Sequence, residues 1–563
     1  MRAWRLFAIG CLLVLAGSLL AWRVQTASGV EVRDVRFQGA SGTTMSGLLY
    51  LPRNATPQTP APGVLAVHGY INTRETQSGF AIEFARRGYV VLAMDQTGHG
   101  YSGGAAFSNG FGGPDGLAYL RGLDIVDPAN VGLEGHSMGG WTVLAAAAAQ
   151  RDGYKAMVLQ GSSTGPPFAA PGTPTWPRNL ALVFSRYDEF SKTMWGVDRA
   201  VDAPSSPKLK TLFAATADVE PGRIYGSIEA GTARVLHTPP VTHPGDHLST
   251  RAIGHSTDWF ARTLAGGTPR PASDQIWWWK ELGTGIALVG VLVLILGAFD
   301  GLLRTPLFAK LHQPVAADEP RGPGGGRGTL LLTAFLPVLT FFPAFILAGL
   351  VLPPSPILPQ GITNQVLAWA VVNAVLSLGI GLMSKRAAPR FANRWVLSAL
   401  LAAAVVAIGY VALFLADRLL QVDFRFWVVA LKLPSADQLR ISLVYVIPFT
   451  LAFALSLRSL LANVVAPRGA ARSAYTAGIA AMSLGFLVML AVIYGVLFAT
   501  GTLLTAFDPL STVVAIQFLP LTAAIGLIAA FTYRRTRSYA PAAILCGLLV
   551  TLYVVAGTAT QVV

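Results

Sequence analysis

The feature that most constrains this chain is a series of apolar runs that are long enough to cross a lipid bilayer. One run covers about residues 6–22, and eight more follow at 282–303, 329–352, 364–383, 395–416, 441–463, 474–500, 510–532 and 539–559. A hydrocarbon core about 30 Å thick needs roughly 20 apolar residues in a helix. Only 12% of the residues are charged, whereas soluble proteins carry about 25%. The sequence therefore predicts an all-α bundle of transmembrane helices over residues 271–563.

The first run predicts either an N-terminal transmembrane anchor or a signal peptide within residues 1–30. Ala21-Trp22-Arg23 is a poor cleavage site, whereas Thr26-Ala27-Ser28 keeps a cleaved signal peptide open. We expect an uncleaved anchor. Because Arg2 and Arg5 precede the run, its first end should stay in the cytoplasm and residues 31–270 should lie outside.

The loops of the second half support this orientation. Lys and Arg residues occur in each loop expected on the cytoplasmic side, 304–328, 384–394, 464–473 and 533–538. The short outside connections 353–363 and 501–509 contain neither residue type, whereas the outside loop 417–440 contains both basic and acidic residues. This asymmetry follows the positive-inside rule and accounts for basic residues in a chain of net charge +14. No basic-aromatic motif accompanies the charge, so we expect no nucleic-acid partner.

Residues 31–270 have the pattern of a soluble α/β domain. Short β-rich runs alternate with helical stretches and are bounded by Gly, Pro or Asn, as at Gly63–His68, Val90–Asp95, Val131–Gly135 and Ala156–Gly161. This alternation predicts a mostly parallel sheet with helices on both faces. The two cysteines, Cys11 and Cys546, lie in apolar runs, so the sequence predicts no disulfide framework, no metal site and no cofactor.

The strongest chemical signal is Gly135-His136-Ser137-Met138-Gly139, a G-x-S-x-G motif between the strand-like Asn130–Glu134 and the helical Trp141–Gln150. This is the context of a nucleophile elbow. The turn is sharp, and a side chain at 135 or 139 would collide with neighbouring elements. We expect it to lift the Ser137 hydroxyl above the sheet edge. The Met138 N–H would then lie at a helix start, where negative charge is stabilised.

The motif and three further segments resemble the α/β-hydrolase superfamily. The segments are Val67-His68-Gly69-Tyr70, Asp95-Gln96-Thr97-Gly98-His99-Gly100-Tyr101-Ser102 and Leu182-Val183-Phe184-Ser185-Arg186-Tyr187-Asp188-Glu189. The resemblance covers about residues 31–265 and is closest to the serine-aminopeptidase-like and dienelactone-hydrolase-like branches. It implies an oxyanion hole formed by the N–H groups of Tyr70 and Met138, and a triad acid at Asp188. The membrane half resembles no family that we can name.

A serine nucleophile needs a base that is oriented by an acid. Asp188 follows an apolar strand and is the expected acid, with Glu189 as the fallback. The expected base is His243, six residues before the expected N-cap at Ser249, with His247 as the alternative. Five other histidines are expected to have structural roles; they are His68, His99, His136, His237 and His255.

These residues predict a membrane-embedded serine hydrolase that cleaves an ester, thioester or amide through an acyl-Ser137 intermediate. The expected substrate is a small-molecule, lipid or peptide-like acyl compound, with membrane lipid as a further partner. The alternatives are a transporter or sensor with a non-catalytic hydrolase-fold domain, and an acyltransferase that uses the same acyl-enzyme. The sequence leaves the substrate and the oligomeric state open.

Overall fold

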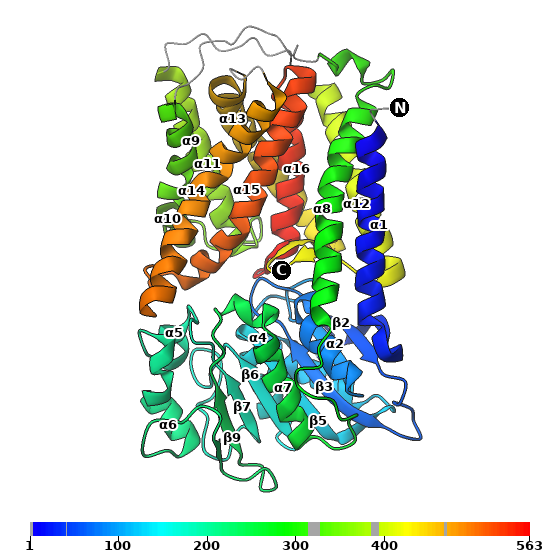
Figure 1. The fold of residues 1–563 in the computed structure, drawn as a ribbon, viewed down its shortest axis with the longest axis vertical. Helices are drawn as coiled ribbons and strands as arrows, with labels where there is room; N and C mark the ends of the chain where they lie inside the picture. Colours follow the sequence, from blue (N-terminus) through cyan, green and yellow to red (C-terminus); the bar gives the residue numbers. More distant parts are fainter. Residues whose placement is uncertain (1–3, 41, 314–326, 384–392, 467–469) are drawn as a thin grey trace. The chain divides into compact units, whose positions relative to one another are not determined.

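The computed structural model describes residues 4–40, 42–313, 327–383, 393–466 and 470–563 (Figure 1). It divides into two compact units. The helical unit comprises Met1–Ser18, Thr284–Val492 and Leu510–Ala556, and the sheet unit comprises Leu19–Gly283, Ile493–Pro509 and Gly557–Val563. Residues 314–326, 384–392 and 467–469, which belong to the predicted cytoplasmic loops 304–328, 384–394 and 464–473, lie outside the described residues, as do Arg2 and the rest of residues 1–3.

The sheet unit is built on nine strands in the order β1-β2-β4-β3-β5-β6-β7-β9-β8. The neighbouring pairs from β4 to β9 are parallel, whereas β2 is antiparallel to β1 and β4, and β8 is antiparallel to β9. The strands are β1 Glu31–Gln38, β2 Thr44–Leu51, β3 Ala61–Val67, β4 Val90–Asp95, β5 Val126–His136, β6 Ala156–Gln160, β7 Leu180–Val183, β8 Ile224–Tyr225 and β9 Arg234–His237. The predicted mostly parallel α/β sheet is therefore confirmed.

Helices cover both faces of this sheet (Figure 1). The α2 helix (Ser78–Arg86) and the α7 helix (Thr250–Thr263) bury Phe84 and Phe260 against one face. The other face is covered by α3 (Gly113–Arg121), α4 (Met138–Ala149), α5 (Ser191–Trp195) and α6 (Pro207–Phe213). The central strands are apolar along their whole length because both of their faces are buried, as in β3 and β4.

The described residues contain nine helices that are long and apolar enough to cross a membrane. The chain thus has the helices of a multi-pass membrane protein. In chain order these elements are α1 Arg5–Gln25, α8 Trp277–Leu302, α9 Arg327–Leu339 with α10 Phe341–Val351, α11 Gly361–Met383, α12 Trp395–Leu420, α13 Ala436–Leu460, α14 Ala471–Thr500, α15 Pro509–Thr536 and α16 Ala540–Gly557. Each of the predicted apolar runs forms such a span, and a short hairpin of β10 (Phe424–Phe426) and β11 (Val429–Leu431) lies between α12 and α13.

Glycines let α1 and α8 approach closely within the helical unit. A Cβ atom added at Gly297 would lie 2.2 Å from the backbone nitrogen of Phe7, and one added at Gly10 would lie 2.4 Å from that of Leu294. Lipid-facing helices gain little from the hydrophobic effect, so close backbone packing at small residues is a main source of their association. The first helix is therefore fitted to α8 by backbone contact.

We expect Gly297→Leu to force α1 away from α8 and to destabilise the helical unit by about 1–3 kcal/mol, the usual cost of overpacking. Gly379→Leu is the matched control, because a Cβ atom at Gly379 meets no atom within 4 Å. The measurement is the midpoint of thermal unfolding of the full chain in detergent. Equal midpoints for the two variants would contradict the packing described here.

Candidate active site

Ser137 sits in a strained turn between β5 and α4. Its backbone has φ 55° and ψ −120°, a conformation that L-residues adopt at a cost and that persists only where the surroundings enforce it. A Cβ atom at Gly135 would lie 2.2 Å from the carbonyl oxygen of Gly139, and one at Gly139 would lie 2.1 Å from that of Val67. Only glycine fits at either position. Ser137 itself is half-buried.

The loop that follows β3 lies directly against Ser137. A Cβ atom at Gly69 would be 3.0 Å from the Cβ atom of Ser137, and Tyr70 is the next residue. On the other side, α4 begins at Met138. The first backbone N–H groups of a helix have no partner within the helix, and they carry its positive dipole end. Both residues expected to form an oxyanion hole thus neighbour Ser137.

The loops after β7 and β9 run side by side and bring Asp188 and His243 together. The Tyr187 N–H donates to the Val241 carbonyl over 3.1 Å, which continues the parallel pairing of the two strands. The Nδ1–H of His243 donates to Oδ2 of Asp188 over 2.9 Å, and both side chains are buried. Oδ1 of Asp188 accepts the Phe190 N–H over 2.8 Å. Each Asp188 oxygen therefore has a donor, and the carboxylate orients the imidazole.

The end of β6 joins this pair to the serine turn. The Ser137 N–H donates to the Gln160 carbonyl over 2.8 Å. The next residue, Gly161, has φ +52°, and a Cβ atom there would lie 2.8 Å from Nδ1 of His243. In addition, Nε2 of His136 donates to the His243 carbonyl over 2.9 Å. The backbone of β6 and the residue before Ser137 thus place His243 beside the turn.

The electrostatics of this edge favour a protonated His243. Burial opposes the charge, but the carboxylates of Asp188 and Glu189 outweigh burial and raise the pKa of the His243 imidazole. Burial, together with the neighbouring Asp188 charge, raises the pKa of Glu189 to about 7. Burial also raises the pKa of the Asp246 carboxyl well above its usual range, although this group accepts a hydrogen bond from the Ser185 hydroxyl.

The rings of three other histidines pack against aromatic or histidine rings. The His247 ring packs against His136, with centroids 4.2 Å apart, and against Phe80 at 5.9 Å. His237 and His255 stack on each other at 3.8 Å, and burial lowers the pKa of His237 to about 3. Among the residues that the structure describes, no group of three His, Cys, Asp or Glu side chains is placed to hold a metal ion.

A chain of aromatic side chains borders the turn. The Tyr70 ring lies 5.6 Å from that of Phe107, which stacks on Phe168 at 5.6 Å, and Phe168 lies 5.1 Å from Trp141. Trp141 lies in the first turn of α4, four residues after Ser137. Phe107 and Phe168 are 37% and 43% exposed, which leaves an apolar surface, the aromatic wall, next to the turn.

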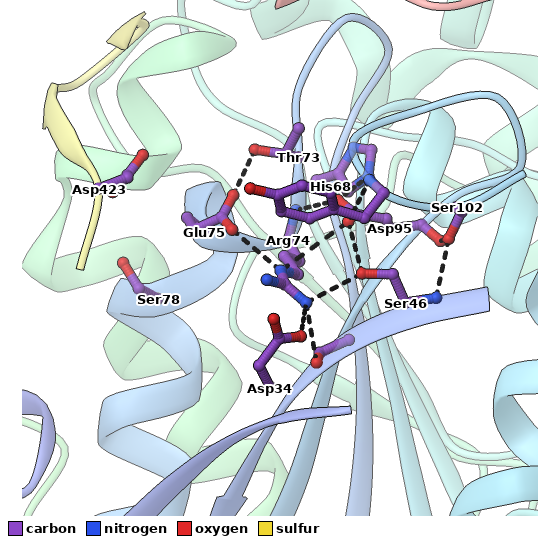
Figure 2. A network of polar contacts seen from close by, with 12 residues as sticks. Asp34, Ser46, His68, Thr73, Arg74, Glu75, Ser78, Asp95, Ser102 and Asp423 are labelled. Atoms are coloured by element: carbon purple, nitrogen blue, oxygen red, sulfur yellow. Dashed lines mark hydrogen bonds and ion pairs between the residues drawn. The ribbon is translucent and has the colours of Figure 1, made fainter. Parts of the chain in front are cut away.

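A buried arginine, Arg74, follows Tyr70 by four residues and takes part in a network of polar contacts, which Figure 2 shows. The Arg74 side chain is 1% exposed and donates to the carboxylates of Asp34 and Glu75 and to the Ser46 hydroxyl. Its backbone N–H donates to Oδ1 of Asp95 at the end of β4 over 2.8 Å. No motif in the sequence marks Arg74. In the sequence it is one charged residue four positions after His-Gly-Tyr, and only the structure shows that it is buried.

Glu189, His136 and Tyr494 also take part in the site, although the sequence suggested lesser roles or none. Glu189 accepts the His243 N–H through Oε2 over 2.7 Å and the Tyr494 hydroxyl through Oε1 over 2.8 Å. No local motif marks Tyr494, which is 305 positions from Glu189 in the sequence.

The comparison with protein families matches the same part of the chain. Residues 58–195 match the family model described as Hydrolase_4: Serine aminopeptidase, S33. These residues contain the turn at Ser137, the loop of Tyr70 and the loop of Asp188, on a sheet whose parallel strands run from β4 to β9. This part of the chain is an α/β-hydrolase domain. We call β1 to α7, residues 31–263, the hydrolase domain.

Several solved structures are similar to this chain. The esterase PF2001 of Pyrococcus furiosus is 15% identical, covering 42% of this chain and 92% of its own, with a TM-score of 0.32. Est1E from Butyrivibrio proteoclasticus, solved with ferulic acid, is 18% identical and covers 41% and 100%, with a TM-score of 0.29. The hypothetical protein PA2218 of Pseudomonas aeruginosa is 18% identical and covers 43% and 97%, with a TM-score of 0.31. A search of curated proteins gives no significant match.

We expect Arg74→Met to destabilise the hydrolase domain by about 3–5 kcal/mol, because it leaves buried carboxylates without their guanidinium partner. Arg33→Met is the matched control, since Arg33 pairs with Glu31 on the surface of β1, where both side chains are 58% exposed. Thermal unfolding of the two variants in detergent measures the difference. A similar small change in both variants would show that the buried network contributes little.

Proposed function

We propose that the protein is a membrane-embedded serine hydrolase in which Ser137 forms an acyl-enzyme with an ester, thioester or amide. One observation carries the proposal: the strained turn of Ser137 lies beside a buried, hydrogen-bonded pair of Asp188 and His243. A serine hydroxyl, an imidazole and a carboxylate in this order are the components of nucleophilic acyl transfer. The family match of residues 58–195 supports the same class of chemistry.

In the proposed mechanism, Asp188 holds the Nδ1–H of His243, and this tautomer leaves Nε2 free to accept the Ser137 proton. The serine oxygen attacks the carbonyl carbon of the substrate, and the N–H groups of Tyr70 and Met138 stabilise the resulting oxyanion. The imidazolium then gives its proton to the leaving alcohol, thiol or amine. Water attacks the acyl-Ser137 by the same route and releases the acid.

The aromatic wall supports an apolar acyl group as the part of the substrate nearest to Ser137. Phe107 and Phe168 present exposed rings, and their contacts continue to Tyr70 and Trp141 on the two sides of the turn. Covering such rings with an aliphatic or aromatic acyl chain removes apolar surface from water. We infer that esters or amides of apolar acids are preferred over acetyl compounds.

The nine apolar spans and the basic loops support a cell-membrane location with the hydrolase domain on the extracytoplasmic side. In this arrangement the enzyme acts on lipid-like or envelope substrates. The orientation is tested together with the chemistry, because a membrane-impermeant probe reaches only an outside site.

We expect a membrane-impermeant fluorophosphonate probe to label the protein on intact cells, and Ser137→Ala to abolish labelling. His243→Ala should slow labelling by about 100-fold or more, because the serine loses its general base. Ser205→Ala, a change at an exposed serine, is the control and should label normally. Persistent labelling of Ser137→Ala would refute the proposed function. Labelling that appears only after cell lysis would refute the orientation alone.

We expect Phe107→Ala to lower kcat/KM for a p-nitrophenyl octanoate ester by roughly 10-fold while changing the acetate ester little, because one large apolar contact is lost. Ile224→Ala is the control, since Ile224 is also exposed, at 39%, but lies on the edge strand β8. An equal loss of kcat/KM for both esters would show that the aromatic wall does not bind the acyl chain.

A further inference from the structure

The sheet unit contains a segment that comes from the membrane half of the sequence. Helix α14 belongs to the helical unit up to Val492, and residues Ile493–Pro509 belong to the sheet unit. Within the sheet unit, this segment contacts the residues that follow β7. The Phe498 ring lies 5.1 Å from that of Tyr187, and Thr502 forms an isolated β-bridge with Arg199.

The most informative of these contacts is the hydrogen bond from Tyr494 to Glu189. The Tyr494 hydroxyl donates to Oε1 over 2.8 Å, and the His243 N–H donates to Oε2 over 2.7 Å. Glu189 is 4% exposed, so its carboxylate relies on protein donors and not on bulk water. One buried carboxylate thus connects the last turns of α14 to the backbone of His243.

Glu189 restricts the loop after β9 at His243. The His243 backbone is fixed on one side by Glu189 and on the other by His136, which donates to its carbonyl, while Asp188 fixes the ring. Hydrogen bonds to a charged group are shorter and stronger than neutral ones. Loss of the Tyr494 hydroxyl leaves the Glu189 side chain held at one oxygen only.

We propose that Tyr494 is a positioning residue of the hydrolase: through Glu189 it holds the backbone of His243 so that the imidazole faces Ser137. The inference rests on the proposed function. It gives part of the membrane half a role in the chemistry, because the end of a transmembrane helix completes the support of the general base. The catalytic loop and α14 are then linked by a hydrogen bond as well as by the chain.

The charge of Glu189 gives this role a readout in pH. His243 faces the carboxyl groups of Asp188, Glu189 and Asp246 and the imidazole of His136, and Glu189 also faces Tyr494. An ionised Glu189 favours the protonated imidazole and raises the pKa of His243. A base works only when neutral, so the reaction rate falls as the pH drops through this raised pKa. Removing the charge of Glu189 therefore moves the acidic limb of the pH–rate profile to lower pH.

Tyr494 affects the same limb, because its hydrogen bond lowers the pKa of Glu189 and keeps more of the carboxylate ionised near neutral pH. Without the hydroxyl, Glu189 is protonated to a larger extent, and the His243 imidazole loses part of the negative charge that stabilises its protonated form. Tyr494→Phe is therefore expected to shift the acidic limb in the same direction as Glu189→Gln.

The test measures the rate of labelling by a fluorophosphonate probe between pH 5 and 9 for the full chain in detergent. We expect Tyr494→Phe to lower the plateau rate on the order of 10-fold, the size expected when one hydrogen bond to a charged group is lost. Its acidic limb should move to lower pH. Glu189→Gln should behave similarly, because a carboxamide has one acceptor oxygen and cannot serve both donors.

The double variant decides whether Tyr494 acts through Glu189. If it does, adding Tyr494→Phe to Glu189→Gln slows labelling no further. Tyr445→Phe is the matched control: its hydroxyl donates to Asn364 over 2.6 Å in the helical unit, and its loss should leave rate and limb unchanged.

An unchanged plateau and limb in Tyr494→Phe, or additive losses in the double variant, overturn the positioning role while Ser137-dependent labelling stands. If thermal unfolding shows that Tyr494→Phe does not fold, the test is the acidic limb of the pH–rate profile of Glu189→Gln. The absence of a shift in that limb overturns the proposal. If the wild-type protein is not labelled at Ser137, the proposed function fails, and this inference fails with it.

Discussion

The site depends on the close approach of three backbone segments at the carboxyl edge of the sheet. In the turn between β5 and α4, a side chain at Gly135 would collide with the start of α4, and one at Gly139 would collide with the end of β3. The turn therefore forms only because both residues are glycine, and its strain is concentrated at Ser137. The sheet supplies the force that holds this conformation, since β3 and β5 are paired along their length. A strained nucleophile is therefore an outcome of packing in the strands below it.

Buried charge is the second constraint on this edge. Asp188, Glu189 and Asp246 are each less than 5% exposed, and each accepts a hydrogen bond from the protein. Water screens such a group weakly, so the protonation of one group depends on its neighbours. Arg74 is a buried charge of the opposite sign, and it pairs with carboxyl groups from β1 and from its own loop. Buried ionisable residues thus hold these loops in place through hydrogen bonds and ion pairs.

Two kinds of helix packing occur in one chain. In the hydrolase domain, α2 and α7 are attached by large apolar side chains such as Phe84 and Phe260. In the helical unit, α1 and α8 meet at Gly10 and Gly297 with backbone in contact. The difference follows from the solvent: water drives large side chains together, whereas in lipid close contact and hydrogen bonding must supply the attraction.

The sequence alone determined the features that depend on neighbours in the chain: the nine apolar spans, the alternation of strands and helices, and the glycine turn around Ser137. Each is a local pattern with one stable outcome in water or lipid. The sequence left His243 and His247 open as the base, and the tertiary structure placed the ring of His243 on Asp188. Tertiary structure alone buried Arg74 and brought Tyr494 to Glu189 across 305 positions. Such pairings depend on the paths of loops after different strands, and composition and spacing do not encode those paths.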